Sequence, residues 1–209
     1  MKILLINGSP HANGNTSIAL AEVAKTLEAE GIETVTVGIG VQPVRGCVAC
    51  GACRKNNTRC AFSDALYDQL HAILEAGIDG VVVGSPVYYA SANGTLISLL
   101  DRLFYSTSFD KRMKVGASVA VARRGGCSAT FDQLNHFLYL AEALIVPSIY
   151  WNVVHGTTED AIQQDKEGLQ ILENLGQNMA WLLKMREATK DSLDEPSPIA
   201  SKTRTSFIR

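Results

Sequence analysis

The chain has 209 residues, of which 46% are hydrophobic and 19% charged, and its formal net charge is −2. This length and composition fit one sizeable globular domain, and because there is no basic surplus we expect no nucleic-acid partner. No apolar run approaches the ~20 residues of a membrane helix and no cleavable signal pattern is found, so we expect a cytoplasmic protein with no membrane partner.

Five short apolar runs alternate with longer amphipathic segments along the chain. The strand candidates are residues 2–6, 33–39, 80–85, 115–122 and 145–151. Helical spacing of apolar residues begins near Asn15, Ser63, Asn93 and Cys127, and a fifth helix is expected over about 158–188. Because the strands are apolar almost throughout, we predict a doubly wound α/β fold in which helices cover both faces of a parallel sheet.

The boundaries of two segments can be read from local signals. The helix that begins near Ser63 has that serine as its candidate N-cap, and Gly77 is its candidate stop. From about residue 189 the chain becomes polar, with two prolines and no periodicity. We therefore predict one domain over residues 1–188 and an extended tail over 189–209.

The run NGSPHANGNTS, residues 7–17, follows the first strand and opens the first helix. In open parallel sheets, ligands bind beyond the carboxyl ends of the strands, where a helix N-terminus offers unpaired N–H groups and partial positive charge. The phosphate-binding lysine of GxxxxGK[ST] is absent, and so is the GxGxxG pattern. The loop therefore predicts an anion site without naming the anion; a hydrophilic connection with an ordinary cap is the alternative.

The run GCVACGACRKNNTRC contains four closely spaced cysteines in the pattern CxxCxxCx6C: Cys47, Cys50, Cys53 and Cys60. Four thiolates are what an iron-sulfur cluster or a zinc site requires. In a regular helix Cys53 would be rotated away from the first two cysteines, so joint ligation predicts a loop or a broken turn. The tandem spacing favours [4Fe-4S]; a zinc site and free or redox-active thiols remain alternatives.

Two further loops follow the third and fourth strands, as SPVYYASANGT (85–95) and ARRGGCS (122–128). Tyr88 and Tyr89 can form an aromatic wall for a flat ring, and the arginines and glycines of 123–126 combine donors with room for a ligand. The alternatives are tyrosines that cap the core and a solvated arginine pair. Cys127 is interpreted as a packed side chain. A phosphate cradle, an aromatic loop and a donor-rich loop on one rim favour a phosphorylated planar cofactor, with FMN as the candidate.

These three loops and the cysteine segment together resemble the NADPH-dependent FMN reductase family of flavodoxin-like proteins, and within it the iron-sulfur flavoproteins. The resemblance covers residues 1 to about 156. It implies a three-layer sandwich with a five-stranded parallel sheet of order 2-1-3-4-5, and FMN at its edge. It also implies a [4Fe-4S] cluster on the four cysteines of the segment 45–60, and a homodimer or homotetramer. The apolar helix faces and the C-terminal TSFIR also indicate that subunits associate.

The resemblance assigns each loop a part of the cofactor. It implies that the phosphate is held by Ser9, His11, Asn13, Asn15, Thr16 and Ser17. The ring would be bordered by Pro86, Val87, Tyr88 and Tyr89, and the third loop would consist of Arg123, Arg124, Gly125 and Gly126. The family commonly has a basic residue where this chain has His11, so the phosphate would depend less on a fixed positive charge here.

The working hypothesis is a flavin oxidoreductase that takes electrons from NAD(P)H or a ferredoxin-like donor and passes them to a small-molecule or protein acceptor. FMN itself performs the chemistry, so no separate acid or base is required. One alternative is a dedicated electron carrier that exchanges electrons with a ferredoxin-like partner. Another is a redox or metal sensor that uses the cysteine segment as a switch.

Overall fold

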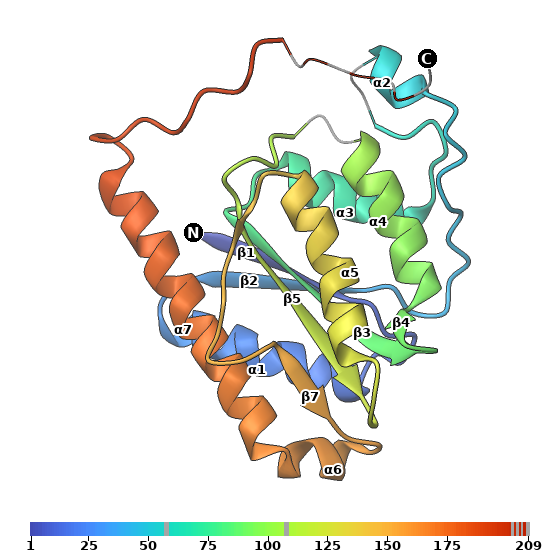
Figure 1. Ribbon diagram of the computed structural model, residues 1–209, viewed down its shortest axis with the longest axis vertical. Helices are drawn as coiled ribbons and strands as arrows, with labels where there is room; N and C mark the ends of the chain where they lie inside the picture. The colour runs from blue at the N-terminus through green and yellow to red at the C-terminus, as the bar shows by residue number, and fades with distance from the viewer. Residues whose placement is uncertain (57–58, 107–108, 202, 204, 206, 208–209) are drawn as a thin grey trace.

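A parallel sheet forms the middle layer of the computed structural model, which describes residues 1–56, 59–106, 109–201, 203, 205 and 207 (Figure 1). Its strands follow the order β2-β1-β3-β5-β6. Their bounds are β1 Lys2–Asn7, β2 Glu33–Gly38, β3 Gly80–Tyr88, β5 Val115–Ala122 and β6 Leu144–Ile145. With β5 as the fourth long strand, the predicted order 2-1-3-4-5 is confirmed, as is the α/β class.

Helices cover both faces of this sheet. One face carries α1 (Asn15–Ala29) and α7 (Lys166–Thr189), and the other carries α3 (Ala65–Glu75), α4 (Gly94–Ser106) and α5 (Cys127–Leu140). Two short helices, α2 (Ala52–Asn56) and α6 (Glu159–Gln164), lie in the connections. None of the helices in the described ranges is long and apolar enough to cross a bilayer.

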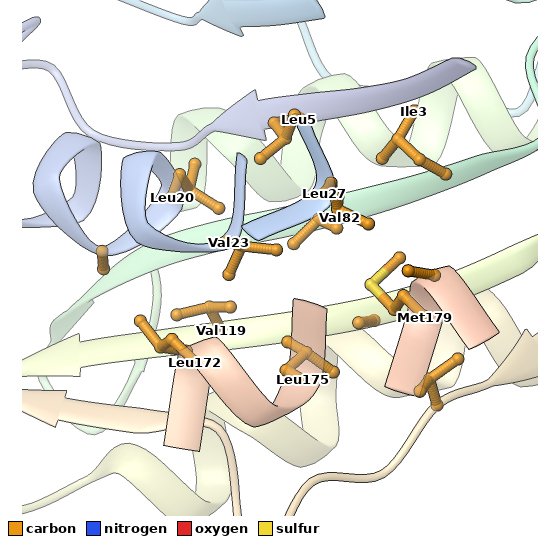
Figure 2. Packing of buried hydrophobic residues seen from close by; sticks show 14 of the residues in the cluster. Ile3, Leu5, Leu20, Val23, Leu27, Val82, Val119, Leu172, Leu175 and Met179 are labelled. Atoms are coloured by element: carbon orange, nitrogen blue, oxygen red, sulfur yellow. The ribbon is translucent and has the colours of Figure 1, made fainter. Parts of the chain in front are cut away.

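Each helical layer has its own apolar core against the sheet. Figure 2 shows the first core, where Val23 of α1 and Leu175 and Met179 of α7 pack against strand residues such as Leu5. The second core joins Leu4 and Ile6 to the inner sides of α3, α4 and α5. Successive residues of β1 thus alternate between the two cores, which is why both faces of the sheet are apolar and both need helices.

The prediction for the fifth strand, residues 145–151, was wrong in its bounds. Instead two short strands, β6 and β7 (Val153–His155), pair with the beginning and the end of β5. Pro147 lies between them and has no N–H to donate to a ladder. The side chain of Asn152 replaces the missing ladder by donating from Nδ2 to the Ser118 carbonyl at 3.0 Å.

Two helix boundaries also differ from the predictions. The N-cap of α3 is Asp64 rather than Ser63, because its carboxylate accepts a hydrogen bond from the Tyr67 N–H at 2.9 Å. The single helix predicted over 158–188 is broken at Asp165, whose side chain caps α7 by accepting from Gly168 N. The stop at Gly77 is confirmed, with a φ of +98° that suits glycine.

The last helix, α7, ends at Thr189, and the described residues beyond it form no regular helix or strand. The tail is held at two points: Arg186 pairs with Glu195, and Arg112 Nη2 donates to the Pro196 carbonyl at 2.9 Å. Ser206, Ile208 and Arg209 of the TSFIR run lie outside the described residues. The division at residue 188 stays a prediction.

Candidate functional site

The three predicted loops meet at the carboxyl edge of the sheet because their strands are neighbours in it. Asn7 at the end of β1 aligns with Gly84 of β3, and Ser85 aligns with Ala120 of β5. We call residues 8–14 the first loop, 89–93 the second loop and 123–126 the third loop. Parallel neighbours thus bring together residues more than a hundred positions apart in the sequence.

Hydrogen bonds join the first loop to the second. Gly8 N donates to the Gly84 carbonyl at 2.7 Å, and Asn93 Nδ2 donates to the Gly8 carbonyl at 2.9 Å. Asn93 N in turn donates to Ser85 Oγ at 3.0 Å, and both Asn93 and Ser85 are buried. A Cβ on Gly8 would contact Leu96 and lie 2.7 Å from the Gly84 carbonyl, so only glycine fits this junction.

The second loop is a tight turn that contacts the third loop. Tyr89 and Ala90 both have positive φ, +51° and +59°, and the turn is closed by β4 (Ser91–Ala92), which pairs antiparallel with the end of β3. Two adjacent non-glycine residues in this region are uncommon and strained. Gly126 has a φ of +94° and packs closely against this turn. A Cβ at this position would lie only 2.8 Å from the Ala90 Cα. The turn is therefore held from outside by the third loop.

Unpaired backbone donors gather in the first loop and the first turn of α1. Gly14 caps this helix without a side-chain hydrogen bond. Among the described residues, the N–H groups of Ala12, Asn13, Asn15 and Thr16 have no acceptor. Ser9 is buried, and its Oγ accepts from His11 N at 3.1 Å. A helix N-terminus with several free N–H groups suits a phosphate, so the first loop fits the phosphate end of FMN.

The predicted phosphate residues differ in how free their side chains are. The Asn15 amide donates to the Gly156 carbonyl at 2.9 Å, so this side chain ties α1 to the segment after β7. His11 and Asn13 are exposed, Ser17 is half-buried, and Thr16 is buried. Ser9, Thr16 and Ser17 are thus more enclosed than His11 and Asn13.

The predicted ring residues lie on the same edge. Pro86 and Val87 are half-buried in β3, and Tyr88 and Tyr89 are exposed, with Tyr89 the more open of the two. In the third loop Arg123, Arg124 and Gly125 are exposed and Gly126 is half-buried. Gly126 packs against Val87 and the strained turn at Ala90, and the exposed aromatic and guanidinium groups can contact a flat ring.

Cys127 follows the third loop but is a packed residue. It is buried at the start of α5, and its Sγ lies 3.7 Å from His155 Nε2, which also lies 3.1 Å from the Arg124 carbonyl. Burial raises the pKa of the Cys127 thiol, so it stays protonated at neutral pH. This agrees with its interpretation as a packed side chain.

The four cysteines of the motif line a single cavity of about 120 Å³. Cys47 and Cys50 lie exposed in an irregular segment, Cys53 lies on α2, and Gly51 between them has a φ of +73°. The segment is thus not a regular helix, and the predicted broken turn is confirmed. Joint ligation of one group by all four thiols requires such a path.

The four thiols can be compared with the two candidate metal centres, a zinc ion and a [4Fe-4S] cluster. Within residues 1–56, 59–106 and 109–201, no three Cys, His, Asp or Glu side chains are placed to hold one metal ion. A zinc ion needs four ligands at bonding distance from one point. In a [4Fe-4S] cluster each thiolate binds a different iron, so the sulfurs lie farther apart. The four thiols that line the one cavity are the donor set that either centre uses.

Two side chains that the sequence reasoning missed support the wall of this cavity. Arg102 of α4 is buried with 1% exposure, lines the cavity and pairs with Asp64. Tyr67 accepts a hydrogen bond from Cys60 N at 2.9 Å, and its ring lies 4.6 Å from the Arg102 guanidinium carbon. The sequence signal that could have revealed Arg102 is its position three residues after Leu99, among the apolar residues of α4.

Charge pairing next to the cavity shifts two pKa values. Burial opposes the charged forms of both Asp64 and Arg102. For Asp64 the hydrogen bonds from Arg102 and the Tyr67 N–H, with the charge of Arg102, outweigh burial and lower its pKa. For Arg102 the interactions with Asp64 and Cys60 outweigh burial and raise its pKa. The pair is therefore ionised at neutral pH.

We expect the Asp64→Asn variant to be less stable than the parent chain at neutral pH, with the difference vanishing in acid. A carboxyl group whose pKa is lower in the folded state stabilises that state above its unfolded pKa of about 3.9. That contribution is lost as the pH falls through the lower folded value. Urea unfolding of both proteins between pH 3 and 7 measures the difference in their free energies of unfolding. If this difference stayed constant over the range, the pairing of Asp64 with Arg102 would be contradicted.

Comparisons with known proteins agree with this geometry. The model of a family described as NADPH-dependent FMN reductase matches residues 1–158. An iron-sulfur flavoprotein of Methanocaldococcus jannaschii is 31% identical over 193 residues, which cover 88% of this chain and 98% of that protein. An iron-sulfur flavoprotein of Methanosarcina thermophila is 28% identical over 195 residues, covering 91% and 100%.

Among solved structures, a flavodoxin from the domain Archaea superimposes with a TM-score of 0.58 at 14% identity. The alignment covers 88% of this chain and 99% of the flavodoxin. At this identity the likeness concerns the fold alone. The sheet with helices on both faces is therefore flavodoxin-like, as the resemblance of the loops predicted.

Proposed function

The chain belongs to the NADPH-dependent FMN reductase family, and on that premise we propose that it passes electrons from NAD(P)H or a reduced protein donor, through FMN, to a small-molecule or protein acceptor. We include in the proposal a [4Fe-4S] cluster held by Cys47, Cys50, Cys53 and Cys60. The observation that supports this proposal is that one chain has both a loop with free N–H groups at the carboxyl edge of the sheet and a cavity lined by four cysteines.

The residues of the loop edge bind and orient the cofactor. The free N–H groups of the first loop and the hydroxyls of Ser9, Thr16 and Ser17 hold the phosphate, whose charge the α1 dipole stabilises. The exposed Arg123 and Arg124 donate to polar atoms of the ring and stabilise negative charge there. When bound, FMN supplies hydride and one-electron chemistry. No protein acid or base is needed beside the ring.

The cysteine cavity has the complementary task of holding a one-electron centre. Its thiolates would each bind one iron, and the aromatic ring of Tyr105 and the backbone around Cys60 shield part of the site. The exposure of Cys47 and Cys50 leaves the opposite side open to a partner. This opening is also the observation that favours the second candidate function, a dedicated electron carrier with a ferredoxin-like partner.

Anaerobic purification with assays of FMN, iron and sulfide tests the cofactor part of the proposal. We expect one FMN per chain and iron and sulfide in equal amounts. Stopped-flow mixing with NADPH, and separately with a reduced ferredoxin, then distinguishes the two functions by bleaching of the flavin absorbance. A full content of FMN without iron would contradict the cluster. If NADPH did not bleach the flavin, the electron-carrier function would be favoured over the reductase. A protein without FMN would favour the redox or metal sensor.

We also propose that the chain forms a homodimer or homotetramer in the cytoplasm. Several large apolar side chains are exposed on the chain: Tyr139, Leu140, Ile149, Tyr150, Trp151 and Trp181. Large apolar side chains at the surface can serve as contacts between subunits. Light scattering of the purified protein measures the number of subunits, and a monomer at all concentrations would contradict this part.

A further inference from the structure

We propose that Arg102 is the positioning residue of the cysteine cavity: it closes both ends of the cysteine segment and places a fixed positive charge beside the cluster. The inference rests on the proposed [4Fe-4S] cluster. Arg102 comes from α4, outside the motif, and no part of the function proposed above uses it.

The first argument is what the guanidinium binds. Nη1 donates to the Arg45 carbonyl at 3.3 Å, and Nη2 donates to the Phe62 carbonyl. These carbonyls lie two residues before Cys47 and two residues after Cys60. The Arg102 side chain therefore holds together the backbone just before the first cysteine and just after the last. This fixes the distance between the two ends of the segment that carries all four thiolates.

The second argument is the depth and charge of the side chain. Arg102 is 1% exposed and lines the cavity, and its Nε has no hydrogen-bond acceptor among the described residues. An unpaired buried donor costs free energy unless a partner is supplied. A cluster with four thiolates is negatively charged and offers sulfur acceptors. A fixed cation in this low-dielectric position stabilises the cluster, and stabilises it more after reduction adds another negative charge.

The third argument is the choice of arginine. A planar guanidinium can donate to Asp64 and to two carbonyls at once, whereas a lysine ammonium on a flexible stem cannot reproduce this fork. Asp64 supports the arrangement from α3, where Oδ1 caps the helix and Oδ2 accepts from Arg102. Three positions, 45, 62 and 64, therefore converge on the Arg102 side chain.

The test compares the reconstituted holoprotein with Arg102→Lys and Arg102→Gln variants. We expect both variants to need roughly 10–100-fold more iron for half-maximal cluster formation, the usual loss on removing a group that orients metal ligands. The cluster reduction potential, measured by dye titration with EPR detection, should become more negative in Arg102→Gln and return toward the parent value in Arg102→Lys. A purely structural arginine would leave the potential unchanged.

Two further variants make the result decisive. Arg112→Gln removes another arginine that bridges a carboxylate, Glu142, and a carbonyl, Pro196, but does not line the cavity; it should match the parent chain. Asp64→Asn keeps a good N-cap residue and removes the negative charge beside Arg102, so the potential should become less negative. This variant carries the test if the Arg102 variants fail to fold, which loss of FMN would reveal.

The outcomes separate this inference from the proposed function. A parent chain that binds no iron would overturn the cluster itself. A parent chain with a cluster whose iron requirement and potential are unchanged in the Arg102 variants would overturn the role of Arg102 and leave the cluster standing. An Asp64→Asn potential equal to or more negative than that of the parent would overturn the electrostatic part.

Discussion

Replacing Cys50 with alanine should abolish the [4Fe-4S] cluster while one FMN per chain remains bound. Cys50 is exposed in the irregular segment before α2, so its side chain contributes little to the core. A four-iron cluster of this type takes one thiolate on each iron, and alanine offers no replacement ligand. Iron and sulfide assays and the visible and EPR spectra of the anaerobic protein measure the loss.

The matched control for this experiment is Cys127→Ala, which removes the one cysteine outside the motif. Cys127 is buried beside the third loop, away from the cavity, and truncating its thiol should cost little stability and no iron. If Cys50→Ala retained the parent content of iron, or Cys127→Ala lost it, the assignment of the ligands to the motif would be wrong.

Replacing Gly8 with alanine should weaken FMN binding strongly without removing the cluster. The added Cβ would meet Leu96 and lie 2.7 Å from the Gly84 carbonyl, so the first loop must move away from β3. Overpacking of a tight site costs about 1–3 kcal/mol, which corresponds to a roughly tenfold to hundredfold rise in the dissociation constant. Titration of the apoprotein with FMN, followed by flavin fluorescence, gives this constant.

Gly38→Ala is the control for this change because Gly38 ends the neighbouring strand β2 and aligns with Asn7. A Cβ there would meet no atom within 4 Å. FMN affinity should therefore stay within a factor of about two of the parent value, as for an ordinary surface substitution. Equal affinity in the Gly8→Ala and Gly38→Ala proteins would show that the first loop tolerates displacement.

The parallel sheet with helices on both faces was predictable because its strands are apolar almost throughout and alternate with amphipathic segments. The strand order followed from the resemblance of the loops to flavodoxin-like proteins. The fifth strand was mistaken because Pro147 and Asn152 act through three-dimensional contacts: a missing N–H and a side chain that reaches Ser118. Similarly, the choice of Asp64 over Ser63 as cap depends on Arg102, which holds the other carboxylate oxygen.

The candidate site could be predicted at the level of loops and motifs but not of individual side chains. The resemblance implies that Asn15 holds the phosphate, and in the structure its amide donates to the Gly156 carbonyl, 141 positions away. Asn93 was predicted only to lie near the start of a helix, whereas it joins two loops through Gly8 and Ser85. Contacts between residues distant in sequence decided each of these cases, and no local pattern contains them.

Helix α4 connects the two candidate cofactor sites within one rigid element. It begins at Gly94, just after Asn93 of the second loop, and Arg102 and Tyr105 on its later turns line the cysteine cavity. At 1.5 Å per residue, Gly94 and Arg102 are about 12 Å apart along the axis. With both cofactors bound as proposed, this helix would fix how far apart the two sites lie within one subunit.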